Sequence, residues 1–227
     1  PGREIDYVNA ALNGYNIERV ALMYRHFVAP LRPDIVVICI NDINGATALA
    51  ARAAGIYDGV HYRRSHLSKQ SALWARVEKN FVVMWRLLHA YSERRKLKAD
   101  AEAVLWDSGR RLAELVRDCQ QEDRLVVLVE NGRRLRSDQS RWQQIRASTS
   151  QVFFLPYLSI PGFLRIQRAQ IELLQEVAAS TKCGFFDLSN VVPGDSRYYQ
   201  DSAHFNDAGS RVFADAMAAQ LRSRVQA

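Results

Sequence analysis

The stretch PDIVVICIND, residues 33–42, decides the fold class of this chain of 227 residues. Its middle part, 35–40, is almost wholly apolar and rich in β-branched side chains. A run of this kind predicts a central strand of a parallel sheet, covered by other elements on both faces. The strand ends in Asn41 and Asp42, and in open α/β sheets ligands bind at the carboxyl ends of the strands. The alternative for these two residues is a simple turn, since both residue types favour turns.

The sequence before this strand predicts a strand, a turn and a helix. Residues 5–11 form a short, mostly apolar run, and the turn over 12–16 contains Gly14, where φ can be positive. Apolar residues at helical spacing then predict a helix over 17–29, which Pro30 ends. An order of strand, helix and strand is typical of parallel α/β sheets.

The segment from 43 to about 123 is predicted to be mostly helical and is longer than a crossover between neighbouring strands needs. We therefore expect a single domain over 1–227 with an enlarged helical insertion at about 43–123. The helix predicted over 71–91 carries a stripe of large apolar residues: Leu73, Trp74, Val77, Phe81, Met84, Trp85 and Leu88. Such a stripe predicts a face packed into the core. A face that lies on a membrane surface, or a lid over an acyl pocket, is the alternative.

The second half of the chain completes an alternation of strands and helices. Two segments, 125–130 and 152–158, are strand candidates, and the sequence does not decide which of them joins the sheet. A long helix over about 163–180 and a last strand over 183–188 follow. The alternation predicts an α/β fold with a mostly parallel sheet and helices on both of its faces.

The candidate catalytic residues lie in DSAHFNDAG, residues 201–209. Asp201 and His204 stand three residues apart, so their side chains project from the same side of one turn. The carboxylate can accept the Nδ1–H of the imidazole and leave Nε2 free as a general base, which is half of a hydrolytic triad. We expect Asn206 or Asp207 to cap the helix that follows. A surface turn without chemistry is the alternative interpretation.

Charge and cysteine content exclude several classes of function. The net charge of +7 comes with no base-stacking motif or zinc spacing, so we expect solvated basic faces and no nucleic-acid partner. The three cysteines, Cys39, Cys119 and Cys183, show no metal-ligand spacing and no disulfide framework. Cys39 and Cys183 lie in apolar strands and are predicted to be small buried hydrophobes. No metal or other cofactor is expected. Binding of the basic surface to an anionic membrane is an alternative that the sequence allows. The sequence assigns neither a compartment nor an oligomeric state.

The sequence resembles the SGNH, or GDSL-type, serine hydrolases in three blocks, which occur in the family's order: VNAALNGYN at 8–16, PDIVVICIND at 33–42 and DSAHFNDAG at 201–209. The resemblance implies a flavodoxin-like three-layer α/β/α sandwich and ester hydrolysis without a cofactor. It implies that the backbone N–H of Gly14 and the side-chain amide of Asn41 form an oxyanion hole. It makes His204 the general base and Asp201 the residue that orients it.

The chain departs from this family in two places. Cys39 stands where the family usually has a Gly two residues before the Asn, and the larger side chain narrows the approach to the site. The family's Gly-Asp-Ser nucleophile loop follows its first strand, whereas this sequence starts at about the second strand. We therefore expect an N-terminally truncated hydrolase that lacks its first strand and nucleophile loop and is inactive as it stands. Gly194-Asp195-Ser196 follows the last strand and is predicted to be a turn, not the nucleophile.

The expected function is hydrolysis of an acyl or acetyl ester of a lipid, a glycan or a small molecule by a Ser-His-Asp triad, with the Ser upstream of this chain. A fold of the α/β-hydrolase type is not expected, because the sequence holds no Gly-x-Ser-x-Gly elbow. The alternative is a non-catalytic protein of the same SGNH fold that binds an acylated glycan or a protein partner.

Overall fold

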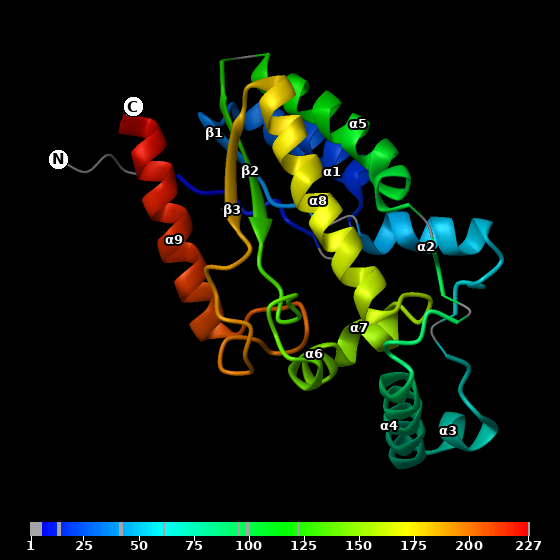
Figure 1. Ribbon diagram of the computed structural model, residues 1–227. Coiled ribbons are helices and arrows are strands. Elements are labelled where there is room, and N and C mark those ends of the chain that lie inside the picture. Colours follow the sequence, from blue (N-terminus) through cyan, green and yellow to red (C-terminus); the bar gives the residue numbers. More distant parts are fainter. Residues whose placement is uncertain are drawn as a thin grey trace.

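The computed structural model describes residues 6–12, 15–40, 43–60, 62–94, 96–98, 100–121 and 123–226. Within them the strands form a three-stranded parallel sheet in the order β1-β2-β3 (Figure 1). The strands are β1 (Ile35–Ile38), β2 (Leu125–Asn131) and β3 (Gly184–Leu188). β1 and β3 pair with β2 on either side, both in parallel. The predicted α/β fold with parallel strands is confirmed.

Helices occupy much of the remaining described chain. They are α1 (Ile17–Met23), α2 (Ile43–Ala53), α3 (His66–Gln70), α4 (Ala72–Leu88), α5 (Ala101–Gln120), α6 (Arg141–Ala147), α7 (Thr149–Phe154), α8 (Ile160–Thr181) and α9 (Asp207–Gln226). The helix predicted over 17–29 changes its winding along its length: α1 continues into a π-helical turn, η1 (Tyr24–Val28), and a 3₁₀ turn, η2 (Ala29–Leu31). Arg32 then takes the left-handed conformation, with φ of 50°, and the helix ends.

The sheet is the middle one of three layers (Figure 1). On one face, α1, α5 and α8 pack on alternate residues of the strands, among them Val126 and Leu128. On the other face, α9 packs on the intervening residues, among them Val127 and Phe186. β2 is therefore buried on both sides, which is why its sequence is an uninterrupted apolar run.

Of the two strand candidates in the second half, 125–130 joins the sheet and 152–158 does not. The second candidate begins inside α7 and continues into a turn that contains Pro156. A proline has no backbone N–H to donate to a sheet ladder, whereas every residue of β2 has one. This difference in hydrogen-bonding capacity favours β2 as the middle strand.

The prediction of a central strand at residues 35–40 is wrong in its position. β1 is an edge strand that pairs with β2 alone among the described strands. Ile35 and Val37 are each 38% exposed, because α9 builds its cluster with β2 and β3 and leaves this side of β1 open. Cys39, which follows β1, is exposed as a residue, whereas burial raises the pKa of its thiol to about 11.

The strand predicted over 5–11 is absent from its described part, residues 6–11. Tyr7 and Val8 are exposed there. None of the described strands pairs with this segment.

The apolar face of α4 is exposed, so the prediction that it packs into the core is wrong. We use the name α4 stripe for its seven large apolar residues, Leu73, Trp74, Val77, Phe81, Met84, Trp85 and Leu88, all of which are exposed. The opposite side of α4, with Val83 and Leu87, packs against the core cluster that includes α7. Because α4 is apolar on both sides, the periodicity of its sequence could not indicate which side faces inward.

Candidate active site

The carboxyl ends of the strands bring the loop after β2, the loop after β3 and the start of α9 to one end of the sheet (Figure 1). The loop after β3 carries the predicted pair Asp201 and His204. A hydrogen bond joins the two loops, because the backbone N–H of Arg134 donates to the carbonyl of Ser202 (3.3 Å). The pair therefore lies at the end of the sheet where ligands bind in open α/β folds.

Asp201 and His204 form a hydrogen-bonded pair, as their spacing predicts. Nδ1 of His204 lies 2.8 Å from Oδ2 of Asp201, the distance of a charge-assisted hydrogen bond. The other carboxylate oxygen, Oδ1, accepts hydrogen bonds from the backbone N–H groups of Ala203 (2.7 Å) and His204 (2.8 Å). The carboxylate thus shapes the turn and accepts a hydrogen bond from the Nδ1–H of the ring, which leaves Nε2 as the nitrogen that can take a proton. The side chain of His204 is 67% exposed, so a substrate can reach it.

The surroundings of Asp201 favour its ionised form. Partial burial raises the pKa of the carboxyl, but the hydrogen bonds from Ala203 and from the backbone and ring of His204 outweigh it, and the pKa lies below its ordinary value. An ionised carboxylate only accepts hydrogen bonds. It therefore holds the neutral imidazole in the tautomer that carries its proton on Nδ1, which is the orientation a general base needs.

The turn that carries the pair is braced by its neighbours. Tyr199 and Phe205 form an antiparallel β-bridge across its base, and their ring centroids lie 5.0 Å apart. Ser202, inside the turn, is buried, and its hydroxyl accepts a hydrogen bond from the backbone N–H of Ser150 in α7 (2.9 Å). His204 is therefore held on a frame that is connected to the protein core.

Asn206, one of the two predicted caps, caps the start of α9, which begins directly after the turn. Oδ1 of Asn206 accepts a hydrogen bond from the N–H of Gly209 (3.1 Å), and its carbonyl accepts one from Ser210 (2.8 Å). Gly209 is required for a close approach, since an added Cβ would overlap the carbonyl oxygen of Tyr198. The block DSAHFNDAG thus encodes the pair, the bridge and the helix start together.

A buried polar cluster lies at the carboxyl end of β2 and was not predicted from the sequence. Glu130 is completely buried, and its Oε2 accepts a hydrogen bond from Nε2 of Gln170 in α8 (2.9 Å). Burial raises the pKa of Glu130 to about 7, while the Gln170 hydrogen bond and the charge of Arg133 oppose the rise. Arg133 is buried too, 5.5 Å from the ring centroid of Phe163. Like Asn41, Glu130 is a polar residue near the end of an apolar strand, and this sequence pattern could have identified it.

Gly14 and Asn41, the two predicted oxyanion-hole residues, lie outside the described residues. The structure therefore brings together Asp201 and His204 of the four predicted site residues, and the oxyanion hole stays a prediction. Tyr15 and Ile40 are their nearest described neighbours along the chain, and Ile40 is buried.

The Gly194-Asp195-Ser196 sequence forms a surface turn. Asp195 pairs with Arg197 at 2.9 Å, and Ser196 is exposed. In the described part of the chain, the ring of His204 hydrogen-bonds to Asp201 and to no hydroxyl or thiol group. Among the described residues, the His204–Asp201 pair therefore has no hydroxyl or thiol group hydrogen-bonded to its ring.

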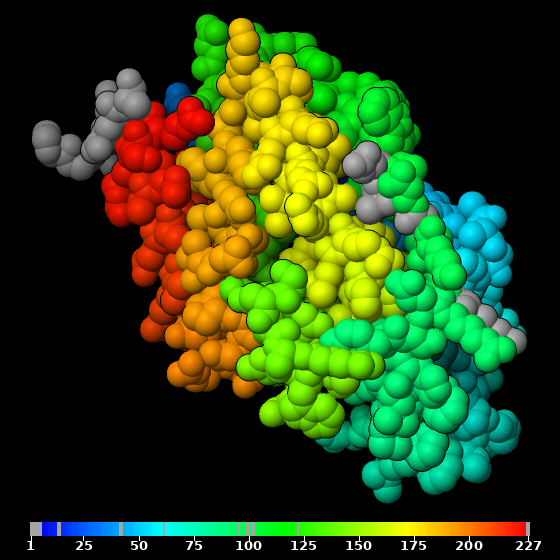
Figure 2. All heavy atoms as spheres, in the orientation of Figure 1, coloured from blue at the N-terminus to red at the C-terminus, as the bar shows by residue number. Residues whose placement is uncertain are grey.

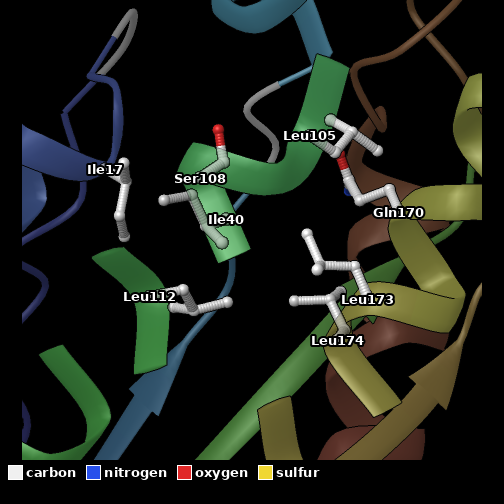
Figure 3. A pocket seen from close by; sticks show the side chains of 8 residues that line it. All are labelled: Ile17, Ile40, Leu105, Ser108, Leu112, Gln170, Leu173 and Leu174. Atoms are coloured by element: carbon white, nitrogen blue, oxygen red, sulfur yellow. The ribbon is translucent and has the colours of Figure 1, made fainter. Parts of the chain in front are cut away.

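A small apolar cavity lies near the end of β1, between α1, α5 and α8 (Figure 3). Its walls are the side chains of Ile17, Ile40, Leu105, Ser108, Leu112, Gln170, Leu173 and Leu174. Its volume of about 20 Å³ is enough for roughly one water molecule. The cavity is too small for an acyl group and does not serve as a substrate pocket in this form.

Metal sites and membrane spans were sought among the described residues. They hold no group of three or more His, Cys, Asp and Glu residues that could bind a metal ion. None of the helices they form is both long and apolar enough to cross a bilayer.

Comparison with known proteins identifies the fold. No family model and no curated protein sequence matches the chain. Among solved structures, the chain is similar to the crystal structure of an acetyl xylan esterase, AlAXEase, with a TM-score of 0.50 over 92% of this chain and 77% of that one. The two sequences are 13% identical, so this likeness shows a shared fold and leaves the activity to be argued from the site.

Proposed function

We propose that this chain carries the general base and the orienting carboxylate of an SGNH-type serine ester hydrolase whose nucleophile lies N-terminal to Pro1. The observation that carries the proposal is the 2.8 Å hydrogen bond between His204 and Asp201, on a braced turn at the carboxyl end of a parallel sheet. The similarity in fold to an acetyl xylan esterase supports an ester bond as the target. A single flavodoxin-like domain, enlarged by the helices at about 43–123, belongs to the same proposal.

The chemistry follows from the roles of these groups. Nε2 of His204 takes the proton of the Ser hydroxyl as the Ser oxygen attacks the ester carbonyl carbon. The Asn41 amide and the Gly14 N–H donate hydrogen bonds to the developing oxyanion. The protonated ring gives its proton to the leaving alcohol, while Asp201 stabilises the imidazolium. Water, activated by the same base, then releases the acid from the acyl-enzyme without a cofactor.

The substrate class we propose is an acyl or acetyl ester of a lipid, a glycan or a small molecule. The open position of the His204 ring suits an ester on a bulky carrier such as a glycan, because nothing in the described residues encloses Nε2.

The test is ester hydrolysis by a chain extended upstream of Pro1 through its reading frame, with p-nitrophenyl acetate as substrate and a fluorophosphonate probe for the nucleophile. His204→Ala is expected to lower kcat/KM by about 1000-fold or more, and Asp201→Asn by a similar factor, because the base loses its function or its tautomer. His26→Ala, an exposed histidine on η1, is the matched control and should leave activity unchanged. Full activity of His204→Ala would contradict the proposal. The 227-residue chain without the extension is expected to be inactive.

The second candidate function is a non-catalytic protein of the same fold that binds an acylated glycan or a protein partner. One observation favours it, namely that His204 meets no nucleophile in the described part of the chain. An upstream strand that ends in Gly-Asp-Ser would support the enzyme. An upstream strand without Ser, together with binding of acetylated xylan and no release of acetate, would support the binding protein.

A further inference from the structure

The α4 stripe is a continuous apolar face that points away from the protein. On a helix of 3.6 residues per turn its seven residues lie within an arc of about 120°. Leu73 is 74% exposed, Phe81 64% and Trp85 60%. In Figure 2, α3 and α4 lie in the protrusion at the lower right of the molecule, opposite the end that carries the amino ends of the strands. Monomeric soluble proteins rarely leave an apolar face of this kind without a partner.

Polar contacts of α4 residues outside the stripe hold this orientation. Arg86 donates hydrogen bonds to the backbone carbonyls of Phe153 (2.8 Å) and Val152 (3.3 Å) in α7. Glu78 accepts hydrogen bonds from the hydroxyl (2.6 Å) and the backbone N–H (3.0 Å) of Ser65. Rolling the helix to bury the stripe would break these bonds, and hydrogen bonds to charged groups are among the stronger ones in proteins. The side of α4 that carries Arg86, Val83 and Leu87 therefore faces the protein, and the α4 stripe faces outward.

The part of the sequence that contains this helix is rich in positive charge. Residues 62–98 contain ten Lys and Arg residues against two Glu residues, a net charge of +8, whereas the whole chain carries +7. Lys69, at the end of α3, and Arg76, one turn into α4, are both exposed. A surface that combines apolar residues with this excess of positive charge suits a partner that is apolar inside and negatively charged outside.

We propose that the α4 stripe docks this protein on an anionic lipid bilayer. In this arrangement α4 lies in the plane of the membrane, with the stripe at the boundary between headgroups and acyl chains and exposed basic residues such as Lys69 and Arg76 on the lipid phosphates. Trp74 and Trp85 belong to the residue type that is enriched at this boundary. A second copy of the chain is a poorer partner, because it would bring a second cluster of the same charge against the first.

The position of α4 determines which end of the protein would face the membrane. α4 and the loop that carries Asp201 and His204 both lie toward the carboxyl end of the sheet (Figure 1). Docking through α4 would hold this end of the protein near the lipid surface. The inference does not depend on the proposed function, since binding of lipid requires no nucleophile.

Sedimentation with sucrose-loaded vesicles tests the proposal on the chain as it is. Vesicles of phosphatidylcholine with about 30 mol% phosphatidylserine are expected to bind the protein, and vesicles of phosphatidylcholine alone to bind it far more weakly. The double substitution Phe81→Glu and Trp85→Glu should weaken binding at least about tenfold, because it places charges where the acyl chains begin. Lys69→Glu with Arg76→Glu should weaken it as well and reduce its sensitivity to salt.

Two control variants match these changes in exposure and charge. Trp106→Glu with Trp142→Glu replaces tryptophans that are 72% and 68% exposed on α5 and α6. Arg211→Glu with Arg222→Glu makes the same charge change on α9. Both should bind vesicles nearly as the unchanged chain does. Far-UV circular dichroism of each variant checks that it is folded.

Three results would overturn the proposal. The first is no binding to vesicles of either composition. The second is an equal loss of binding in the α4 and the control variants, which would mean nonspecific attraction by net charge. The third is a dimer in sedimentation velocity that Phe81→Glu with Trp85→Glu dissolves while vesicle binding is absent, which would make a second copy the partner of the α4 stripe.

Discussion

β2 and α4 are both rich in large apolar residues, and the protein treats them in opposite ways. Val126 to Val129 in β2 are at most 2% exposed, because α5 and α8 cover one face of the strand and α9 covers the other. Leu73 and Leu88 in α4 are 74% and 73% exposed. The difference shows that an apolar pattern identifies a surface that needs a partner, whereas the partner itself is set by what lies next to it in space.

The two elements also differ in how they treat a carboxyl group. Glu130 in β2 is buried, and burial raises the pKa of its carboxyl to about 7. Glu78 in α4 is held by Ser65, whose hydroxyl and backbone hydrogen bonds lower the pKa of the carboxyl. The strand thus carries a carboxyl group whose charge is costly, and the helix carries one whose charge is stabilised.

The largest expected effect is a difference in the free energy of unfolding between two leucine substitutions. Leu128→Ala in β2 should lower the free energy of unfolding by about 2–5 kcal/mol, because it leaves a cavity in a core that closes on both faces of the strand. Leu88→Ala on the α4 stripe should change it by less than about 0.5 kcal/mol, since the side chain is already exposed to water. Urea denaturation followed by circular dichroism measures both. Equal losses in the two variants would break the comparison.

The next effect is a pH dependence from Glu130. Its pKa in the folded protein is raised above the unfolded value, so the folded state binds the proton more tightly and stability falls as the pH rises from about 4.5 to 7. The fall is expected to be roughly 3 kcal/mol, and Glu130→Gln should remove it. The pH dependence of stability that Glu78 causes has the opposite sign. The stabilising contribution of Glu78 is present above its unfolded pKa and is lost as the pH falls through the lowered pKa of the folded state.

Denaturation curves at several pH values distinguish these two carboxyl groups. Glu130→Gln should be more stable than the unchanged chain at pH 8 and close to it at pH 4.5. Glu78→Gln should show its difference at pH 8 as a loss that shrinks as the pH falls toward 4. A flat pH profile for the unchanged chain between 4.5 and 7 would show that Glu130 is not a buried acid.

The smallest effect tests which side of α4 faces the protein. Arg86→Ala should destabilise the chain by about 1–3 kcal/mol, because it leaves the carbonyls of Val152 and Phe153 without their charged donor. Arg76→Ala, on the same helix but exposed, should cost less than about 0.5 kcal/mol. Urea midpoints of the two variants measure the difference. If Arg76→Ala cost more than Arg86→Ala, the orientation of α4 and with it the exposed stripe would be wrong.

The candidate site was predictable where its geometry is local. Asp201 and His204 are three residues apart, and one turn with a carboxylate that accepts two backbone N–H groups is enough to bring their side chains together. The cap at Asn206 is equally local, since it needs the next helical turn alone. The burial of Glu130 was not predicted because its hydrogen-bond partner, Gln170, comes from α8, forty residues further along the chain. Their contact depends on how α8 packs against β2.

The sequence by itself determined the class of fold, the alternation of elements, the start of α9 and the hydrogen-bonded pair in DSAHFNDAG. Each of these follows from interactions between residues within a few positions of one another, or from runs that are apolar throughout. Tertiary structure alone decided that β1 lies at an edge, that 125–130 and not 152–158 joins the sheet, and that the α4 stripe faces outward. In each case several surfaces were apolar enough to be buried. The choice among them rested on which helix lay beside which strand, and that placement is a property of the assembled layers.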